Sequence, residues 1–382
     1  MTPTATQRPS NSLTERLDQG PVICAEGYVF ELERRGYLQA GAFVPEVVLE
    51  HPEVVAQLHR DFVHAGSDVV EALTYYAHRE KLRIIGREKD LEPINRRALD
   101  IAKTVAAESG AFFAGDICNT NVYDPADAAS HKAVRAMFEE QVGWAVDAGV
   151  DFIIGETFSY AQEALIALDV VKRAGQTAVI TLAMHQADVT RENWGVVDAC
   201  KRLADAGADV VGLNCIRGPA TMMPLLREIR AAVKTHIAAL PVPYRTSERE
   251  PSFQSLRDAH WHYDEGSRPF PIALDPFTCN RFEIAEFGQQ ALGLGIHYLA
   301  CAAVPGLTTF ARWPRPWASA RRAADTPPTC RSTRSWGRTS GSRRSRRTTR
   351  ASSSDSACGR DGPVTRNARR SACDRRPRDS NG

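Results

Sequence analysis

One junction recurs three times along this 382-residue chain and constrains its fold more than any other feature. Each copy joins the end of an amphipathic helical stretch to a glycine and then to an apolar run; the copies span residues 64–70, 147–154 and 205–211. Glycine suits the left-handed conformation that commonly follows a helix, and such apolar runs are typical of parallel strands covered on both faces. The repetition predicts a chain built from successive βα units.

The same alternation extends from about residue 20 to residue 303. We expect eight strands, at residues 22–25, 68–72, 111–115, 151–156, 178–182, 209–215, 240–244 and 297–300. We expect helices at residues 51–64, 91–109, 131–147, 160–174, 194–206, 219–234 and 281–293. This order favours the α/β class and a closed (β/α)8 TIM barrel over residues 20–303. Glycine-rich phosphate loops of the dinucleotide-binding and Walker types do not occur in the sequence.

The N-terminal residues and the composition indicate the cellular location that we expect for the protein. Residues 1–19 are polar and are expected to be flexible, without the apolar centre of a secretory signal. No apolar stretch approaches the roughly 20 residues that cross a bilayer, so we expect no membrane contact and a cytoplasmic location. The 9 cysteines are scattered, which favours metal binding or burial over a disulfide framework.

The last part of the chain differs sharply in composition. Residues 311–382 hold 19 Arg and 5 Asp, with no Lys, Glu, Leu, Ile, Met, Phe or Tyr. A segment with almost no large apolar side chains cannot offset the entropy cost of folding. We therefore predict a disordered tail over residues 304–382 and an incomplete last βα unit.

Catalytic groups of a TIM barrel follow the carboxyl ends of its strands, and here several predicted strands end in polar residues. Glu26, Glu156 and Cys215 each follow or close an apolar run. A thiol next to an amide, as in Asn214–Cys215, suits a metal ligand, although a cysteine there can equally be a buried structural residue.

At this point several segments resemble the homocysteine S-methyltransferase family, and the betaine–homocysteine type most of all. The similar segments are residues 22–37, 45–46, 51–53, 75–77, 155–158 and 212–215. The most specific of them is the strand that ends in Asn214–Cys215. The resemblance covers roughly residues 20–300.

The resemblance implies a Zn2+-dependent enzyme that moves a methyl group from betaine, or a similar onium donor, to homocysteine and yields methionine. A free thiol with a pKa of about 8.5 is mostly protonated at neutral pH, and zinc held by three thiolates leaves a position where the substrate sulfur can ionise. The implied catalytic residues are Glu156 and Tyr76. The implied substrate-binding residues are Glu26, Gly27, Phe43, Tyr76, Glu156, Thr157 and Asn214.

Each implied role has an ordinary alternative. Glu26 and Glu156 are expected to hold the homocysteine ammonium group, but acids at strand ends can simply face solvent. Phe43 and Tyr76 are expected to cradle the quaternary ammonium of the donor, but aromatic residues can simply pack.

The sequence departs from the family pattern at the last strand. The family carries two adjacent cysteines there, whereas this chain has a single Cys301, which would be a displaced second zinc ligand beside Cys215. Loss of one base near the codons for Leu299 and Ala300 explains this difference and the change in composition together. In the alternative frame permitted codons read GVCCGAGPHHIRAM from residue 300, which places the cysteine pair at Ala302 and Ala303, and RYSPDMSKHAFLG near residues 325–337. We therefore interpret residues 304–382 as out of frame and expect weak zinc retention.

Three alternatives stay open at the level of function. S-methylmethionine could be the donor, because Thr157 and Phe43 stand where the betaine-type enzymes carry tyrosine and tryptophan. The chain could be an inactive barrel. The Arg-rich tail could bind nucleic acid. Because the shifted reading frame already explains the composition of the tail, we expect no nucleic-acid partner. A homo-oligomer is expected only with an intact C-terminus.

Overall fold

The computed structural model describes residues 12–39, 41–185, 188–258, 260 and 268–301, and shows a closed barrel of eight parallel strands in the order β1 to β8. The strands are β1 (Val22–Ala25), β2 (Val69–Glu71), β3 (Phe112–Cys118), β4 (Phe152–Phe158), β5 (Ala178–Leu182), β6 (Val210–Asn214), β7 (His236–Leu240) and β8 (Tyr298–Cys301). β1 pairs with β8 over four residues, which closes the barrel. The predicted TIM barrel is confirmed.

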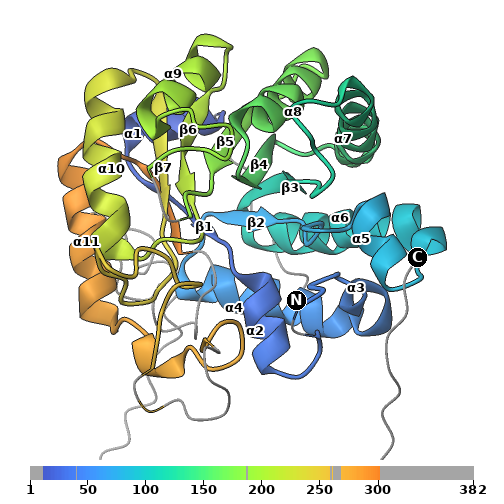
Figure 1. Cartoon of the computed structure of the whole chain (residues 1–382). Helices are drawn as coiled ribbons and strands as arrows, with labels where there is room; N and C mark the ends of the chain where they lie inside the picture. The colour runs from blue at the N-terminus through green and yellow to red at the C-terminus, as the bar shows by residue number, and fades with distance from the viewer. Residues whose placement is uncertain (1–11, 40, 186–187, 259, 261–267, 302–382) are drawn as a thin grey trace, which may run out of the picture. The chain divides into compact units, whose positions relative to one another are not determined.

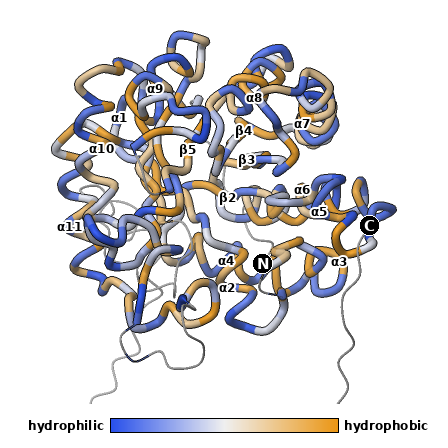
Figure 2. Tube along the Cα trace, viewed as in Figure 1, coloured by the Kyte–Doolittle hydropathy of each residue, from blue (hydrophilic) through white to orange (hydrophobic). Residues whose placement is uncertain are grey.

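Helices surround the strands in the same alternating order (Figure 1). They are α1 (Leu13–Gln19), α2 (Tyr28–Arg34), α3 (Val47–Glu50), α4 (Pro52–Ala65), α5 (Arg79–Ile84), α6 (Leu91–Ser109), α7 (Ala128–Ala148), α8 (Ala161–Arg173), α9 (Val196–Asp205), α10 (Pro219–Ala232) and α11 (Arg281–Gly293), with short 3-10 turns η1 (Glu88–Asp90) and η2 (Asp275–Phe277). The helices alternate hydrophobic and hydrophilic residues along their length (Figure 2), as amphipathic helices over a barrel should.

The recurring glycine junctions have the conformation that the sequence predicts. Gly66, Gly149 and Gly207 have φ of 115°, 79° and 97°, in the left-handed region. Gly66 and Gly149 directly follow α4 and α7 as their C-terminal caps. Each chain reversal therefore delivers the next strand into the barrel.

Two apolar layers form the barrel core of the described residues, and a third, smaller cluster includes Ile216, Tyr244 and Phe253. Alternate strand residues such as Val22, Phe152 and Tyr298 form a cluster inside the barrel, while their neighbours, such as Ile23, Ile153 and Leu299, pack with the helices. This is the two-residue alternation of a strand buried on both faces.

The seventh strand lies four residues earlier than predicted. The prediction of residues 240–244 was wrong, because β7 spans His236–Leu240 and ends immediately before Pro241. Proline cannot donate a hydrogen bond to a neighbouring strand, so Pro241 and Pro243 are poorly suited to a central position.

Part of the N-terminal segment forms helix α1 (Leu13–Gln19), and the flexibility of residues 1–19 stays a prediction. Ser12 caps α1 through a reciprocal capping box with Glu15. Leu13 and Leu17 join the apolar cluster inside the barrel, so α1 covers that cluster. Residues 1–11 lie outside the described residues.

The predicted tail, residues 304–382, also lies outside the described residues, as do Ala302 and Ala303. Disorder, the shifted frame and the incomplete last unit therefore stay predictions. In the described part of the chain, every helix is too short or too polar to cross a membrane.

Candidate active site

A cavity of about 250 Å3 lies at the carboxyl ends of the strands. Seven of the nine residues singled out from the sequence line it: Glu26, Gly27, Phe43, Tyr76, Glu156, Thr157 and Cys215. Asn214 and Cys301 are not among the lining residues. The barrel thus brings together residues that are up to 189 positions apart in the chain, from Glu26 to Cys215.

Asn214 lies next to the cavity and forms hydrogen bonds with two residues that line it, Glu156 and Thr157. Its amide nitrogen donates to Oε2 of Glu156 at 2.5 Å and to Oγ1 of Thr157 at 2.8 Å. Its Oδ1 accepts a hydrogen bond from the Thr157 backbone N–H at 2.9 Å. Asn214 therefore positions Glu156 and Thr157 and is not among the residues that line the cavity. Its substrate-binding role stays a prediction.

The backbone around the cavity is strained at several side-chain-bearing residues. In the described part of the chain, six of the seven non-glycine residues with positive φ line the cavity: Phe43, Tyr76, Asn121, Thr157, Cys215 and Ile216. Such conformations cost free energy and concentrate at functional sites. At Cys215 and Ile216 the φ value is 55° for both residues, directly after β6. The turn places the Cys215 side chain on the cavity wall.

An aromatic wall covers part of the cavity. Its members are Phe30, Phe43, Tyr75, Tyr76, Phe253 and Phe270. The Tyr75 and Tyr76 ring centroids are 4.2 Å apart, and those of Phe30 and Phe43 are 5.4 Å apart. The Lys81 ammonium lies 3.7 Å from the Tyr76 ring centroid, so one face of that ring already has a cationic neighbour.

Four of these aromatic residues were not predicted as site residues from the sequence. Phe253 and Phe270 lie between β7 and α11, where the sequence has no strand pattern to place them. Phe30 belongs to α2, and Tyr75 follows β2 beside the predicted Tyr76. Of these four residues, only Tyr75 had a signal in the sequence, because it stands next to the predicted Tyr76 directly after a strand.

Acidic side chains line the cavity on the barrel side. Glu26 and Glu156 are only 3% and 9% exposed, so the alternative of solvent-facing acids is wrong. Glu71 and Asp116, which we did not predict as site residues, also line the cavity and are equally buried. The sequence signal that could have identified Glu71 and Asp116 is an acidic residue within an otherwise apolar strand.

Burial sets the protonation of these groups. Burial raises the pKa of Glu156 to about 7, although hydrogen bonds from Thr157 and Asn214 act in the opposite direction. Burial, followed by the Glu156 and Asp116 carboxylates, raises the pKa of Glu26 well above its usual value. Burial also raises the pKa of the Cys215 thiol to about 12. Without a nearby cation, Cys215 is therefore a neutral thiol.

The two candidate zinc ligands are not brought together at the cavity. Cys301 is fully buried and belongs to the apolar layer between strands and helices, with Ala25 and Leu299. Its neighbour Ala300 faces the barrel interior instead. The described residues offer one thiol at the cavity, Cys215, which does not fit a three-thiolate zinc site.

A closed parallel barrel with acids, aromatic rings and a thiol at the carboxyl ends of its strands defines a TIM-barrel enzyme. Comparison with known proteins is more specific. Residues 23–269 match the family model described as homocysteine S-methyltransferase. The chain belongs to the homocysteine S-methyltransferase family.

Individual relatives agree with this assignment. The chain is 35% identical over 311 residues to betaine–homocysteine S-methyltransferase 1 of Xenopus tropicalis, covering 78% of this chain and 73% of the relative. It is 31% identical over 315 residues to the S-methylmethionine–homocysteine S-methyltransferase of Mus musculus, covering 78% and 79%. Relatives with two different donors in their names therefore match similar shares of the chain.

A solved structure shares the fold. The metallated form of the homocysteine methyltransferase MmuM from Escherichia coli superposes with a TM-score of 0.61 and 17% identity, covering 79% of this chain and 98% of that one. At this identity the likeness supports the barrel fold alone.

Proposed function

We propose that this barrel methylates the sulfur of homocysteine with a methyl group from an onium donor, of which betaine is the first candidate. The observation that supports this most is a single cavity that combines an aromatic wall, buried carboxyl groups and Cys215. Aromatic faces attract a quaternary ammonium or sulfonium group, which cannot donate an N–H or O–H hydrogen bond. Family membership and the activity of the similar betaine–homocysteine S-methyltransferase 1 support the same reaction.

Glu26 and Glu156 are the proposed partners of the substrate ammonium group. Both are buried and line the cavity, and Oε2 of Glu156 is fixed by Asn214 and Thr157. With a pKa of about 7, Glu156 is also suited to accept the proton of the homocysteine thiol. The sulfur then bonds to the methyl carbon, while the bond from that carbon to the donor nitrogen breaks and leaves a neutral amine.

Tyr76 and Phe43 are proposed to bind the methyl donor together with the other aromatic residues of the wall. Tyr76 is fixed by its backbone N–H, which contacts Sγ of Cys118 at 3.2 Å. Phe43 contacts Phe30 and holds a positive φ of 53°. Such fixed rings bind a donor with little loss of side-chain freedom.

S-methylmethionine is the second candidate donor. It is favoured by the mouse relative of that name and by Thr157, whose small side chain is committed to Glu156 and Asn214 and contributes no ring to the wall. The two donors differ at the atom that leaves, nitrogen in betaine and sulfur in S-methylmethionine.

Zinc binding by this chain depends on how many thiols reach the cavity. We propose that this chain binds zinc weakly through Cys215, because the described residues supply no second thiol to the cavity. The remaining family positions, Ala302 and Ala303, carry no thiol in this sequence. A matching loss of activity is expected in the 382-residue chain.

The test compares two versions of the protein. Methionine formation from homocysteine is measured with betaine and with S-methylmethionine, for the 382-residue chain and for a version translated in the alternative frame from residue 300. We expect turnover with betaine in the frame-restored version and little in the chain as written. No turnover with either donor in the zinc-loaded, folded frame-restored version would contradict the proposed function.

A further inference from the structure

The cavity has a second polar region besides the buried acids of the barrel interior. Ser159 directly follows β4, His185 and Arg191 lie between β5 and α9, and Gln254 lies between β7 and α11. All four side chains line the cavity, and together they are referred to as the polar rim. None of them was singled out from the sequence, because they belong to segments without a strand or helix pattern.

Hydrogen bonds join the members of the polar rim. The Arg191 backbone N–H donates to the Ser159 carbonyl oxygen at 2.9 Å. The Ser159 hydroxyl lies 2.9 Å from Nε2 of His185, and Nδ1 of His185 lies 3.1 Å from Oε1 of Gln254. Three loops of the barrel are therefore fixed to one another at this edge of the cavity.

The charge state of His185 determines which end of the Gln254 amide stays free. Burial and the nearby positive charges of Arg191 and Arg217 lower the pKa of His185, although its hydrogen bond with Gln254 acts in the opposite direction. The ring is therefore neutral at neutral pH and carries one proton. Because an amide oxygen only accepts, that proton lies on Nδ1, and Nε2 accepts from the Ser159 hydroxyl. The NH2 group of Gln254 thus remains available as a donor.

Arg191 is the positively charged member of the polar rim. It is the only Lys or Arg side chain among the described residues that line the cavity. Within the described ranges, none of the ion pairs includes it. Its guanidinium lies 5.8 Å from the ring centroid of Tyr160. A guanidinium without a carboxylate partner is suited to bind the carboxylate of a ligand through two parallel hydrogen bonds.

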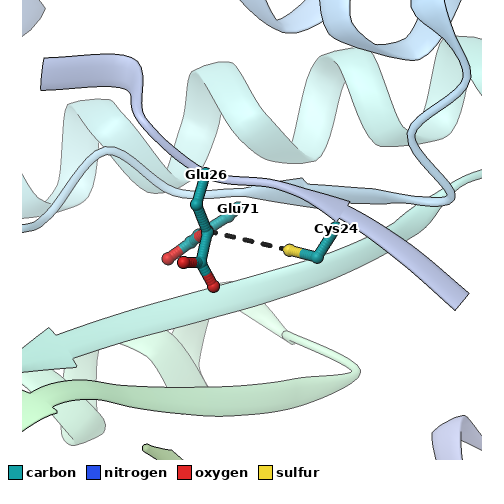
Figure 3. A group of neighbouring side chains, drawn as sticks. All are labelled: Cys24, Glu26 and Glu71. Atoms are coloured by element: carbon teal, nitrogen blue, oxygen red, sulfur yellow. Dashed lines mark hydrogen bonds between the residues drawn. The ribbon is translucent and has the colours of Figure 1, made fainter. Parts of the chain in front are cut away.

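The cavity therefore has residues of both charge signs. Figure 3 shows two of the acids, Glu26 and Glu71, side by side, with the Cys24 thiol 3.8 Å from Glu71 Oε2. The aromatic wall is continuous with the polar rim, since Phe253 is directly followed by Gln254 and both line the cavity. In betaine a single methylene group separates the quaternary ammonium from the carboxylate. A donor whose onium group contacts the aromatic wall can thus place its carboxylate at the polar rim.

We propose that Arg191 and the Gln254 amide bind the carboxylate of the methyl donor, with His185 and Ser159 as positioning residues. The cavity then selects onium donors that carry a carboxylate close to the onium centre over onium compounds that lack one. This assignment rests on the proposed methyl transfer for its choice of ligand, and it adds the chemical class of the donor.

Tetramethylammonium is the matched probe, because it carries the quaternary ammonium of betaine without the carboxylate. Binding of each compound to the full 382-residue chain is measured by saturation-transfer NMR titration of its methyl signal. We expect the chain to bind betaine more tightly than tetramethylammonium. Arg191→Gln should weaken betaine binding about 10-fold, since it removes hydrogen bonds between charged groups, and should not weaken tetramethylammonium binding. Arg191→Lys keeps the charge and should retain part of the betaine affinity.

A second variant tests the positioning role. His185→Ala removes the contact that orients the Gln254 amide, so it should weaken betaine binding while tetramethylammonium binding stays unchanged. Arg173→Gln is the matched control, because it removes an exposed arginine of α8 that is not among the cavity-lining residues. It should leave both affinities unchanged.

Three results would each overturn the proposal: no betaine binding by the parent chain, equal betaine affinity of Arg191→Gln and the parent, or equal losses for both probes in Arg191→Gln. Failure of the proposed reaction is a different result. If the frame-restored protein forms no methionine while betaine binding still depends on Arg191, the carboxylate site stands and the methyl transfer does not.

Discussion

The side-chain amide of Asn214, at the end of β6, donates to the Glu156 carboxylate of β4 across a distance of 2.5 Å. The same amide also holds Thr157, which carries a positive φ of 61°. Two strands that are not adjacent in the barrel are therefore joined at the point where Glu156 enters the cavity. Cys215 directly follows Asn214, so the same strand end fixes both a carboxylate and a thiol.

Replacing Asn214 with alanine should weaken homocysteine binding about 10-fold or more, since a hydrogen bond to a charged group contributes roughly 1.5–3 kcal/mol. Isothermal titration with homocysteine measures the effect. Asn280→Ala is the matched control: it removes the N-terminal cap of α11, which costs about 1 kcal/mol of folding stability, and should leave binding unchanged. Equal affinities of Asn214→Ala and the parent would show that Asn214 has no positioning role.

Ligand binding should depend on the protonation of Glu156. Its pKa of about 7 means that the carboxylate becomes charged as pH rises through 7. Methionine has the ammonium group but no titrating thiol, so its affinity should increase from pH 6 to pH 8. Glu156→Gln should bind weakly at every pH. A pH-independent affinity in the parent chain would argue against this role for Glu156.

The buried carboxyl groups of Glu26, Glu71 and Asp116 should make the protein less stable as pH rises. The pKa values of Glu26, Glu71 and Asp116 are raised in the folded state, first by burial and then by neighbouring acids. The folded state then binds more protons than the unfolded state above pH 4–5, so the free energy of unfolding falls with increasing pH. Urea unfolding between pH 5 and pH 8 measures this slope.

The variant Glu71→Gln/Asp116→Asn should flatten that slope, since its amides do not titrate. An equal slope in parent and variant would show that these buried carboxyl groups do not control the pH dependence.

Replacing Cys215 and replacing Cys301 should have different effects on the zinc content of the protein. Cys215→Ser should remove the weak zinc binding of the chain, because Cys215 is the thiol at the cavity. Cys301→Ser should leave zinc content unchanged and instead lower stability, since it places a hydroxyl in a fully buried apolar layer. Zinc content after dialysis, measured by atomic emission, distinguishes them. Loss of zinc in Cys301→Ser would reverse the assignment.

Gly212 should not tolerate a side chain. A Cβ atom there would lie 2.0 Å from the Ala238 carbonyl oxygen on the neighbouring strand β7. Gly212→Ala should therefore lower the free energy of unfolding by about 3 kcal/mol or more. Gly143→Ala is the matched control inside α7, where a Cβ atom meets nothing within 4 Å, and should stabilise by about 0.4–1 kcal/mol. Urea unfolding of both variants measures the difference.

The sequence by itself determined the barrel and most of the cavity. Apolar runs and amphipathic stretches are local signals, and they predicted β1, β5, α6 and α11 at their observed bounds. Polar residues after strand ends, together with the family resemblance, named seven residues that line the cavity. They could be named because every strand of a parallel barrel ends on the same face.

Only the tertiary structure decided which of those residues meet, and how. The direction of the Cys301 side chain depends on strand register, because one residue of offset moves a side chain from the interior to the helix layer. The pairing of Asn214 with Glu156 depends on the curvature of the sheet between β4 and β6. The carboxyl layer of Glu26, Glu71, Asp116 and Glu156 depends on the stagger of four strands. These are contacts between distant segments, which local sequence patterns do not encode.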